Sequence, residues 1–202
     1  MGRRSIHTAD ELKELILVAA TELIERDGLA GLSAREIARR IGYSPGTLYN
    51  VFENLDALVL TIEARLLDRL ATRLAELPQQ DTPEARVLAL ARAYLSFTHE
   101  NPKLWNLLFE HHMPAGKAVP SWYQTKLDGL MTRIEEAVAP LVDTRDPIAP
   151  KRAARVLWSG VHGITSLSTA DKLSNITAES AAPLVEDLVS TYLAGLKHQH
   201  QA

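Results

Sequence analysis

The sequence predicts an all-α fold of about nine helices, with a small N-terminal three-helix domain followed by a larger C-terminal helical bundle. Apolar residues recur every three to four positions along most of the chain, as on the buried face of a helix. No convincing run of alternating apolar and polar residues, the pattern of a strand, interrupts them. Helix-start signals are frequent: Thr8 and Glu11 predict a capping box, and Thr82-Pro83 predicts a helix with proline at its first position.

The individual helices follow from these signals. A stripe from Leu12 to Leu23 ends at Gly28 and predicts a first helix over residues 8–27. Asn54 can cap a helix that ends before Pro78, after which the polar stretch 78–83 reads as a connection. Two short helices are expected within residues 33–52. Further helices are expected to begin at residues 83 and 102 and to span 120–142, 148–170 and 178–197. Thr177 is predicted to cap the last of these helices.

Composition limits the classes of protein that this chain can be. Hydrophobic residues make up 46% of it, which excludes a disordered chain. No apolar run approaches the roughly 20 residues that span a bilayer, and residues 1–15 lack the apolar stretch of a secretory signal. The chain has no cysteine, which rules out disulfides, thiolate metal sites and cysteine nucleophiles. We therefore expect a soluble cytoplasmic protein without membrane contact.

Net charge does not by itself indicate a nucleic-acid partner. The formal net charge is -3, and residues 1–60 hold seven Lys and Arg against nine Asp and Glu. The balance inverts only within residues 33–52, where Arg35, Arg39 and Arg40 face the single acid Glu36. A solvated helix face would explain these arginines equally well, so any contact with a polyanion depends on the local motif.

The most informative stretch is LSAREIARRIGYSPGTLYNVF, residues 32–52. Ser33 and Glu36 predict a capping box for the first of its two short helices, and Gly42 can take the left-handed conformation that ends that helix. Ser44 is placed to cap the second helix, with proline following it at the first position. Leu48 and Phe52 would point to the core, leaving Thr47, Tyr49 and Asn50 outward. Two helices joined in this way form a helix-turn-helix, although a plain hairpin inside a bundle has the same spacing.

Residue identities in this stretch favour DNA reading over the plain hairpin. Proline and glycine in the first turn of the second helix lower its helix propensity, and Tyr49 is an exposed aromatic residue that a purely structural helix would not need. Backbone amides at that helix start can meet a phosphate, and the hydroxyls of Thr47 and Tyr49 can reach phosphates or base edges.

Residues 12–60 resemble the N-terminal domain of the TetR family of transcriptional regulators. The resemblance rests on the first-helix stripe ending in Gly28, on Leu32, Ser33, Arg35, Ile37 and Ala38, on Gly42, Ser44, Gly46, Leu48 and Tyr49, and on Phe52 and Leu58. It implies a DNA-facing surface made of Arg35, Pro45, Gly46, Thr47, Tyr49 and Asn50, with Ser33 and Ser44 beside phosphates. It further implies a helix-turn-helix domain over 8–54, a connecting helix over 55–77, and a ligand-binding and dimerisation domain over 83–202.

Two positions depart from the family pattern. Many members have a lysine three residues after the phenylalanine, where its ammonium meets a phosphate, and this chain has Leu55. A histidine or tyrosine is frequent where this chain has Val51. Fewer ionic contacts imply a shallower dependence of DNA affinity on salt.

The C-terminal half resembles one subclass of the family. Trp158, His162 and Gly163 are similar to the Trp-His-Gly signature that names this subclass. The resemblance implies a cavity for an unidentified small-molecule effector and a homodimer interface formed by the last two helices, to which Gly160 and Gly163 would permit close approach. Candidate cavity residues are Trp105, Leu108, Phe109, Trp122, Trp158 and His162. Aromatic residues at helical spacing are also common in plain cores, so that interpretation stays open.

No metal or cofactor site is expected. Adjacent histidines on a helix diverge by about 100°, so His111 and His112 do not both face one ion easily. The chain has no His-Glu-x-x-His motif and no acidic cluster that would support a metal site.

The sequence therefore predicts a homodimeric repressor that binds an inverted-repeat operator in double-stranded DNA and is released by a small molecule. Two alternatives remain: a dimeric ligand-binding adaptor that has lost DNA binding, and an enzyme on a helical scaffold that pairs a histidine with a carboxylate such as Glu110. The enzyme is disfavoured because no phosphate loop, nucleophile elbow or paired-carboxylate motif occurs in the sequence.

Overall fold

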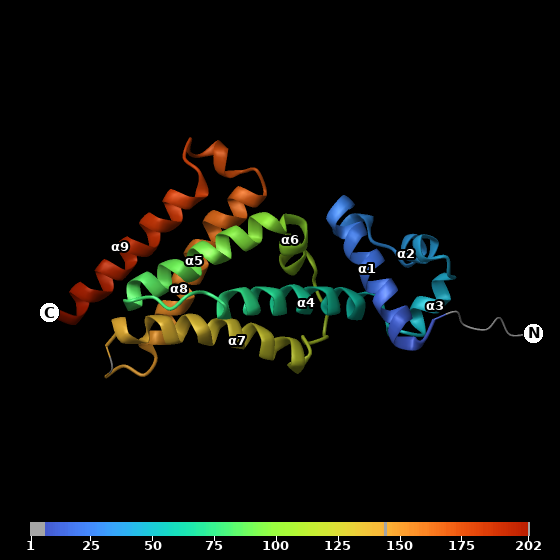
Figure 1. Ribbon diagram of the computed structural model, residues 1–202, viewed down its shortest axis with the longest axis horizontal. Helices are drawn as coiled ribbons and strands as arrows, with labels where there is room; N and C mark the ends of the chain where they lie inside the picture. The colour runs from blue at the N-terminus through green and yellow to red at the C-terminus, as the bar shows by residue number, and fades with distance from the viewer. Residues whose placement is uncertain (1–6, 144, 202) are drawn as a thin grey trace, which may run out of the picture. The chain divides into compact units, whose positions relative to one another are not determined.

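The all-α prediction is confirmed by the computed structural model, which describes residues 7–143 and 145–201, without the side chains of residues 199–201. The described residues form nine α-helices and three short 3-10 turns, with no strand (Figure 1). The helices are α1 (Ala9–Asp27), α2 (Ala34–Ile41), α3 (Pro45–Tyr49), α4 (Leu55–Ala75), α5 (Pro83–Glu100), α6 (Pro102–Glu110), α7 (Ser121–Val138), α8 (Ala149–Thr169) and α9 (Ala181–Gln201).

Side-chain caps explain where several helices begin. The Thr8–Glu11 capping box is present at α1, and the Asn54 Oδ1 atom accepts from the Ala57 amide at 2.8 Å at the start of α4. The prediction that Thr177 caps the last helix is wrong, because its hydroxyl accepts from the Glu179 amide in a local turn and α9 begins only at Ala181.

The helix predicted over 120–142 is shorter in the structure. It begins at Ser121 and ends at Val138. A 3-10 turn over Ala139–Leu141 follows it and contains Pro140, which cannot supply an amide to continue the helix.

The described chain divides into two compact units. The first contains residues 7–66 together with 103–119, and the second contains 67–102 together with 120–201. Helix α4 contributes residues to both units. The sequence-based domain boundaries stay a prediction; they treat residues 55–77 as a separate connecting helix and assign α6 and the loop after it to the C-terminal domain.

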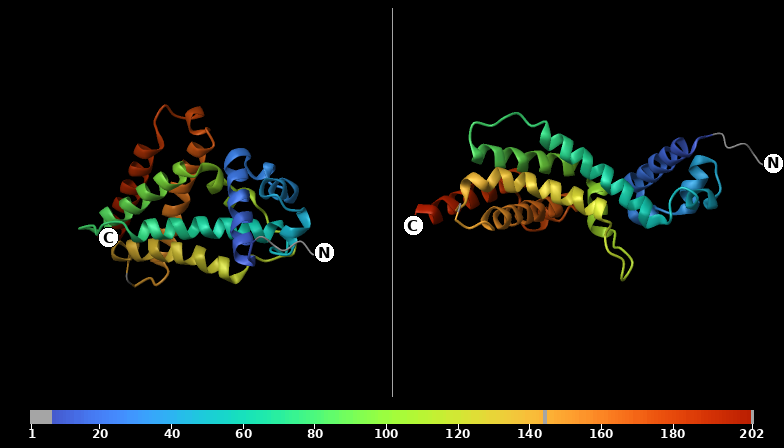
Figure 2. Two further views of the ribbon diagram at one scale, coloured as in Figure 1. Left: turned by 45° about the vertical axis from the view of Figure 1, so that its right-hand side comes forward. Right: turned by 90° about the horizontal axis from the view of Figure 1, so that it is seen from below.

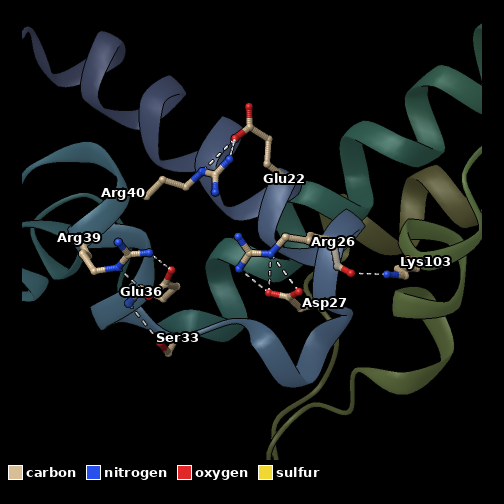
Figure 3. A network of polar contacts seen from close by, with 8 residues as sticks. All are labelled: Glu22, Arg26, Asp27, Ser33, Glu36, Arg39, Arg40 and Lys103. Carbon is tan, nitrogen blue, oxygen red and sulfur yellow. Dashed lines mark hydrogen bonds and ion pairs between the residues drawn. The ribbon is translucent and has the colours of Figure 1, made fainter.

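The first unit is built on α1, which packs against α2, while α2 packs against α3. Its fully buried side chains include Ile16, Leu23, Ile37 and Leu48. Helix α6 adds Leu104 and Leu107 to the buried residues of this unit. Its Lys103 ammonium also donates to the Arg26 carbonyl at the end of α1 (Figure 3).

In the second unit, α5 packs against α7, α8 and α9, and α8 packs against both α7 and α9 (Figures 1 and 2). Gly160 brings α8 close to α9, because a Cβ atom at this position would lie 2.6 Å from the Leu188 Cδ2 atom. Gly163, one turn further along α8, has nothing within 4 Å of its hypothetical Cβ atom. The two glycines predicted to serve close helix approach therefore differ: Gly160 serves packing within the chain, and Gly163 leaves open space.

None of the described helices combines the length and the apolar character that a bilayer span requires.

Candidate nucleic-acid interface and apolar cavity

The α2–α3 pair is held in one geometry by its cap, its turn and its buried face. The Ser33 hydroxyl accepts from the Glu36 amide at 3.2 Å, and Gly42 ends α2 with φ 76° and ψ 28°, in the left-handed region that favours glycine. Leu48 and Phe52 are buried, with exposed fractions of 2% and 7%. Tyr49 follows Leu48 directly and is 51% exposed, because burying Leu48 turns the next side chain outward.

The structure brings the predicted DNA-facing residues together on α2, the turn and α3. Thr47 is half-buried, and the others are exposed: Ser33, Arg35, Ser44, Pro45, Gly46, Tyr49 and Asn50. The Ser44 hydroxyl lies 3.0 Å from the Thr47 hydroxyl, and no backbone amide bonds to the Ser44 side chain. The prediction of a side-chain cap by Ser44 is therefore wrong, since its hydroxyl pairs with Thr47 instead.

Acidic partners offset two of the three arginines on α2 (Figure 3). Arg39 pairs with Glu36 on the same helix, and the Arg40 Nε atom donates to Glu22 of α1 at 3.0 Å. The Arg39 guanidinium lowers the pKa of the Glu36 carboxyl, which keeps that acid ionised. Glu36 bonds Arg39 and not the Ser33 amide, so only half of the predicted capping box forms. Of the α2 arginines, Arg35 alone has no ion pair within the described residues, and it is exposed.

The two positions that depart from the family pattern are both half-buried. Val51 follows α3, and Leu55 is the first residue of α4. Neither side chain can offer the ionic or polar phosphate contact that the family pattern places there.

One contact at this surface had no signal in the sequence. The His7 Nδ1 atom lies 2.6 Å from the Tyr43 hydroxyl, and the two rings lie 6.0 Å apart. This contact joins His7, two residues before α1, to the turn between α2 and α3.

The second unit contains an apolar cavity of about 40 Å³. It is lined by Leu74, Val87, Leu90, Ala91, Tyr94, Ile134, Leu157, Trp158, Val161 and Val189. These residues come from α4, α5, α7, α8 and α9, so the cavity lies where all the helices of this unit meet.

A stacked and hydrogen-bonded group of three rings stands at one wall of this cavity. The rings of Trp158 and His162 stack with centroids 5.0 Å apart and an interplanar angle of 2°. The Tyr94 hydroxyl lies 2.8 Å from His162 Nδ1. Burial lowers the pKa of His162, so the ring is neutral at pH 7. A neutral ring that accepts from Tyr94 at Nδ1 carries its proton on Nε2.

Of the six predicted effector residues, Trp158 alone lines the cavity, and His162 lies behind the lining in contact with Trp158 and Tyr94. Trp122 lies on α7 of the same unit, is 47% exposed and does not line the cavity; its ring packs on Tyr123, with centroids 5.9 Å apart. Trp105, Leu108 and Phe109 belong to the first unit. Sequence reasoning left out the α5 lining of Val87, Leu90 and Tyr94, although the apolar stripe of that helix was a usable signal.

Comparison with protein families gives two matches. Residues 16–62 match the model described as bacterial regulatory proteins, tetR family. Residues 87–192, which are more than half of the chain, match the model described as tetracyclin repressor-like, C-terminal domain. The second match does not test the Trp-His-Gly subclass, which stays a prediction.

Individual relatives give the same result. An uncharacterised helix-turn-helix transcriptional regulator of Mycobacterium tuberculosis is 24% identical over 192 residues, covering 93% of this chain and 82% of that protein. A Rhodococcus protein of unknown function has a similar structure, with 25% identity, a TM-score of 0.74, and coverage of 96% of this chain and 98% of that one. The Thermus thermophilus repressor FadR, solved with lauroyl-CoA, shares the fold at 22% identity and a TM-score of 0.65, with coverage of 91% and 94%.

The lowered pKa of His162 predicts a specific pH dependence of stability. The unfolded chain takes up the proton first as the pH falls, so this contribution to the free energy of unfolding is fully present above about pH 6.5 and declines toward the folded pKa. We expect His162→Phe to lose less stability than the wild type between pH 7.5 and pH 5.5 in chemical denaturation. His99→Asn, which changes an exposed histidine of α5, is the matched control and should keep the wild-type dependence. An unchanged slope in His162→Phe would contradict the assignment.

Proposed function

Since this chain belongs to the TetR family of transcriptional regulators, we propose that it acts as a cytoplasmic homodimeric repressor whose affinity for its operator is controlled by an apolar effector. In this proposal the DNA-reading domain covers residues 8–54, the helix 55–77 connects it, and residues 83–202 bind the effector and the partner chain. The protein performs no catalysis and uses no cofactor.

The proposed DNA contact rests on one observation. Because α3 buries Leu48 against the core, the opposite side of α3 and the neighbouring side of α2 form an exposed surface. Tyr49 and Asn50 present groups that can bond to base edges or phosphates. Arg35 is the cation of α2 that forms no ion pair with an acid of the described residues, so it is the best placed of the three for a phosphate. A two-fold dimer places two such readers about 34–36 Å apart, and its operator is then an inverted repeat.

Selection of bound sequences from a random DNA pool, at two salt concentrations, tests this function. An enriched inverted repeat supports the dimeric reader. The adaptor that has lost DNA binding is the second candidate, and it is favoured by Leu55 and by the acids that offset Arg39 and Arg40. Weak binding without an enriched sequence at either salt concentration would support that candidate.

Substitutions on α2 and α3 test the assignment of the reader. Tyr49→Ala should abolish operator binding without changing the helical content or the oligomeric state. Arg35→Ala should weaken binding and reduce the salt slope by about one, since one phosphate contact is lost. Arg39→Ala should have a smaller effect, because Glu36 already offsets that charge. Arg145→Ala, on the surface of the second unit, is the control, and wild-type affinity in Tyr49→Ala would show that the reader is wrongly assigned.

The homodimer rests on a stripe of exposed small and apolar residues on α8. Val156 and Leu167 are 48% and 38% exposed, and Ser159 and Gly163 lie between them at helical spacing. Open space beside Gly163 permits the close approach of a second copy. The same stripe on both chains would meet across a two-fold axis.

The two glycines of α8 offer a matched test of this interface. Gly163→Arg should convert the dimer to a monomer in light scattering, because a charged side chain would fill the open space, while the free chain keeps its fold. Gly160→Leu should instead lower the free energy of unfolding by about 1–3 kcal/mol through its clash with Leu188. A dimer that survives Gly163→Arg at micromolar concentration would exclude this stripe as the interface.

The effector is proposed to enter the cavity of the second unit, whose lining is apolar apart from the Tyr94 hydroxyl, which bonds His162 behind it. A cavity of about 40 Å³ is far smaller than the roughly 300–1,000 Å³ of sites that enclose drug-sized ligands, so the effector must push the lining residues apart. The FadR neighbour was solved with an acyl-CoA, which favours a fatty acyl chain as the apolar part. An effector that binds only the widened state shifts the population away from the DNA-binding state.

Filling the cavity should separate effector response from DNA binding. Ala91→Val adds two methyl groups to the wall, so fatty acyl-CoA should release this variant from the operator at least about tenfold less effectively than the wild type. Ala89→Val, on the same helix but outside the lining, is the control. Release of Ala91→Val at wild-type acyl-CoA concentrations would place the effector elsewhere.

A further inference from the structure

An open groove of about 500 Å³ in the second unit has no role in the function proposed above. It is lined by the connection between α4 and α5, by the start of α5 and by the end of α7. Polar and charged side chains of this lining include Gln79, Asp81, Arg86 and Glu136. The groove therefore differs in chemistry from the apolar cavity of the same unit.

The groove and the cavity lie within one helical turn of each other on two helices. On α5, Arg86 lines the groove and the next residue, Val87, lines the cavity. On α7, Ile134 lines the cavity and Ala137 lines the groove. Three residues of an α-helix rise about 4.5 Å along its axis. One small molecule can therefore reach from the groove into a widened cavity.

Arg86 gives the groove a cation without a counter-charge. Its side chain is half-buried and forms no ion pair and no hydrogen bond with the residues that the structure describes. Asp81 and Glu136 also line the groove, but both are exposed, where solvent screens their charge, and neither pairs with Arg86. Arg92 on the same helix is different, because its Nε atom donates to Glu186 at 2.8 Å.

A second arginine without a partner lies close to the groove on α7. Arg133 is half-buried and forms no ion pair in the described part of the chain, where its buried Nε atom has no hydrogen-bond partner. It follows Lys126 by two turns, so both lie on the side of α7 that faces α4, where Lys126 bonds Asp68 at 2.6 Å. Ala137 of the groove is one turn further along. A buried donor without an acceptor is unfavourable, and a ligand oxygen would satisfy it.

We propose that this groove binds the anionic head group of the effector, with Arg86 as the main contact and Arg133 as a second donor, while the apolar chain of the effector enters the cavity. The proposal rests on the proposed function, because it needs an apolar effector in the cavity. The ligand class is an apolar chain that ends in a carboxylate or a phosphate, since a guanidinium donates two parallel hydrogen bonds to either group. A neutral head group forfeits these charge-assisted bonds, and a cationic one is repelled by Arg86.

Calorimetric titration of the full chain without DNA tests the charge of the head group. The ligands laurate, 1-dodecanol and dodecylamine share one chain length and differ in charge, and lauroyl-CoA carries its charge on phosphates. We expect laurate or lauroyl-CoA to bind at least about tenfold more tightly than 1-dodecanol, and dodecylamine to bind most weakly. Tightest binding of dodecylamine, or no preference for either anion, would overturn the proposal.

Two glutamine variants test the arginines. Arg86→Gln should weaken the binding of the preferred anion about tenfold and leave the affinity for 1-dodecanol unchanged, which also shows that the variant is folded. Arg133→Gln should act in the same direction by a smaller factor. Arg92→Gln is the matched control and should keep all wild-type affinities, because Arg92 pairs with Glu186 outside the groove.

Arg86→Lys keeps the charge and should keep most of the preference for the anion. If this preference follows laurate, the head group is a carboxylate, and if it occurs only with lauroyl-CoA, it is a phosphate; both results support the site. Wild-type anion affinity in Arg86→Gln would overturn the site, and in Arg133→Gln it would overturn the part given to Arg133.

The neutral ligand separates failure of this site from failure of the proposed function. If 1-dodecanol binds and Ala91→Val weakens its binding, while no anion binds more tightly, the head-group site alone is wrong. If none of the four ligands binds the wild type, the apolar effector of the proposed function is wrong, and the head-group site is wrong with it.

Discussion

The burial of Leu48 and Phe52 is the constraint on which the DNA-reading surface depends. Helix α3 has only five residues, and a helix so short is not stable in water by its own hydrogen bonds. Its existence depends on tertiary packing, to which a fully buried leucine contributes about 1.5–3 kcal/mol. The same burial decides which side chains face outward, since Tyr49 and Asn50 point away once Leu48 points in. One apolar contact thus forms the helix and orients the groups that it offers to DNA.

The charged side chains of the α2–α3 surface pair with nearby acids and contribute little net attraction to DNA. Glu22 and Glu36 offset Arg40 and Arg39, and neither Val51 nor Leu55 adds a cation. Long-range attraction to a polyanion is therefore weak, and the proposed DNA binding relies on shape, hydroxyl groups and Arg35. A protein of this kind recognises its site with a shallow salt dependence.

The second unit differs from the first in that it holds a polar ring, His162, beside an apolar cavity. The neutral His162 ring stacks on Trp158, and its Nδ1 atom bonds the Tyr94 hydroxyl, so this nitrogen has a partner without the ring carrying a charge. A small apolar cavity at the meeting point of its helices is a place where packing can open with little loss of polar contacts. These properties suit a unit that responds to an apolar molecule, and they also explain why few polar residues mark the site in the sequence.

The sequence by itself determined the helices, the turn at Gly42 and the outward residues of α3, because caps, glycine and apolar spacing act over a few neighbouring residues. It also located Trp158 and His162, which are one helical turn apart and share a face. Only the tertiary structure decided that Trp122 stays outside the cavity while Tyr94 and Ala91 line it. It likewise decided that α6 packs with the first unit and that His111 meets Asp56 and Glu63, 55 and 48 residues away. Contacts over such separations depend on how whole helices pack, and no local pattern encodes them.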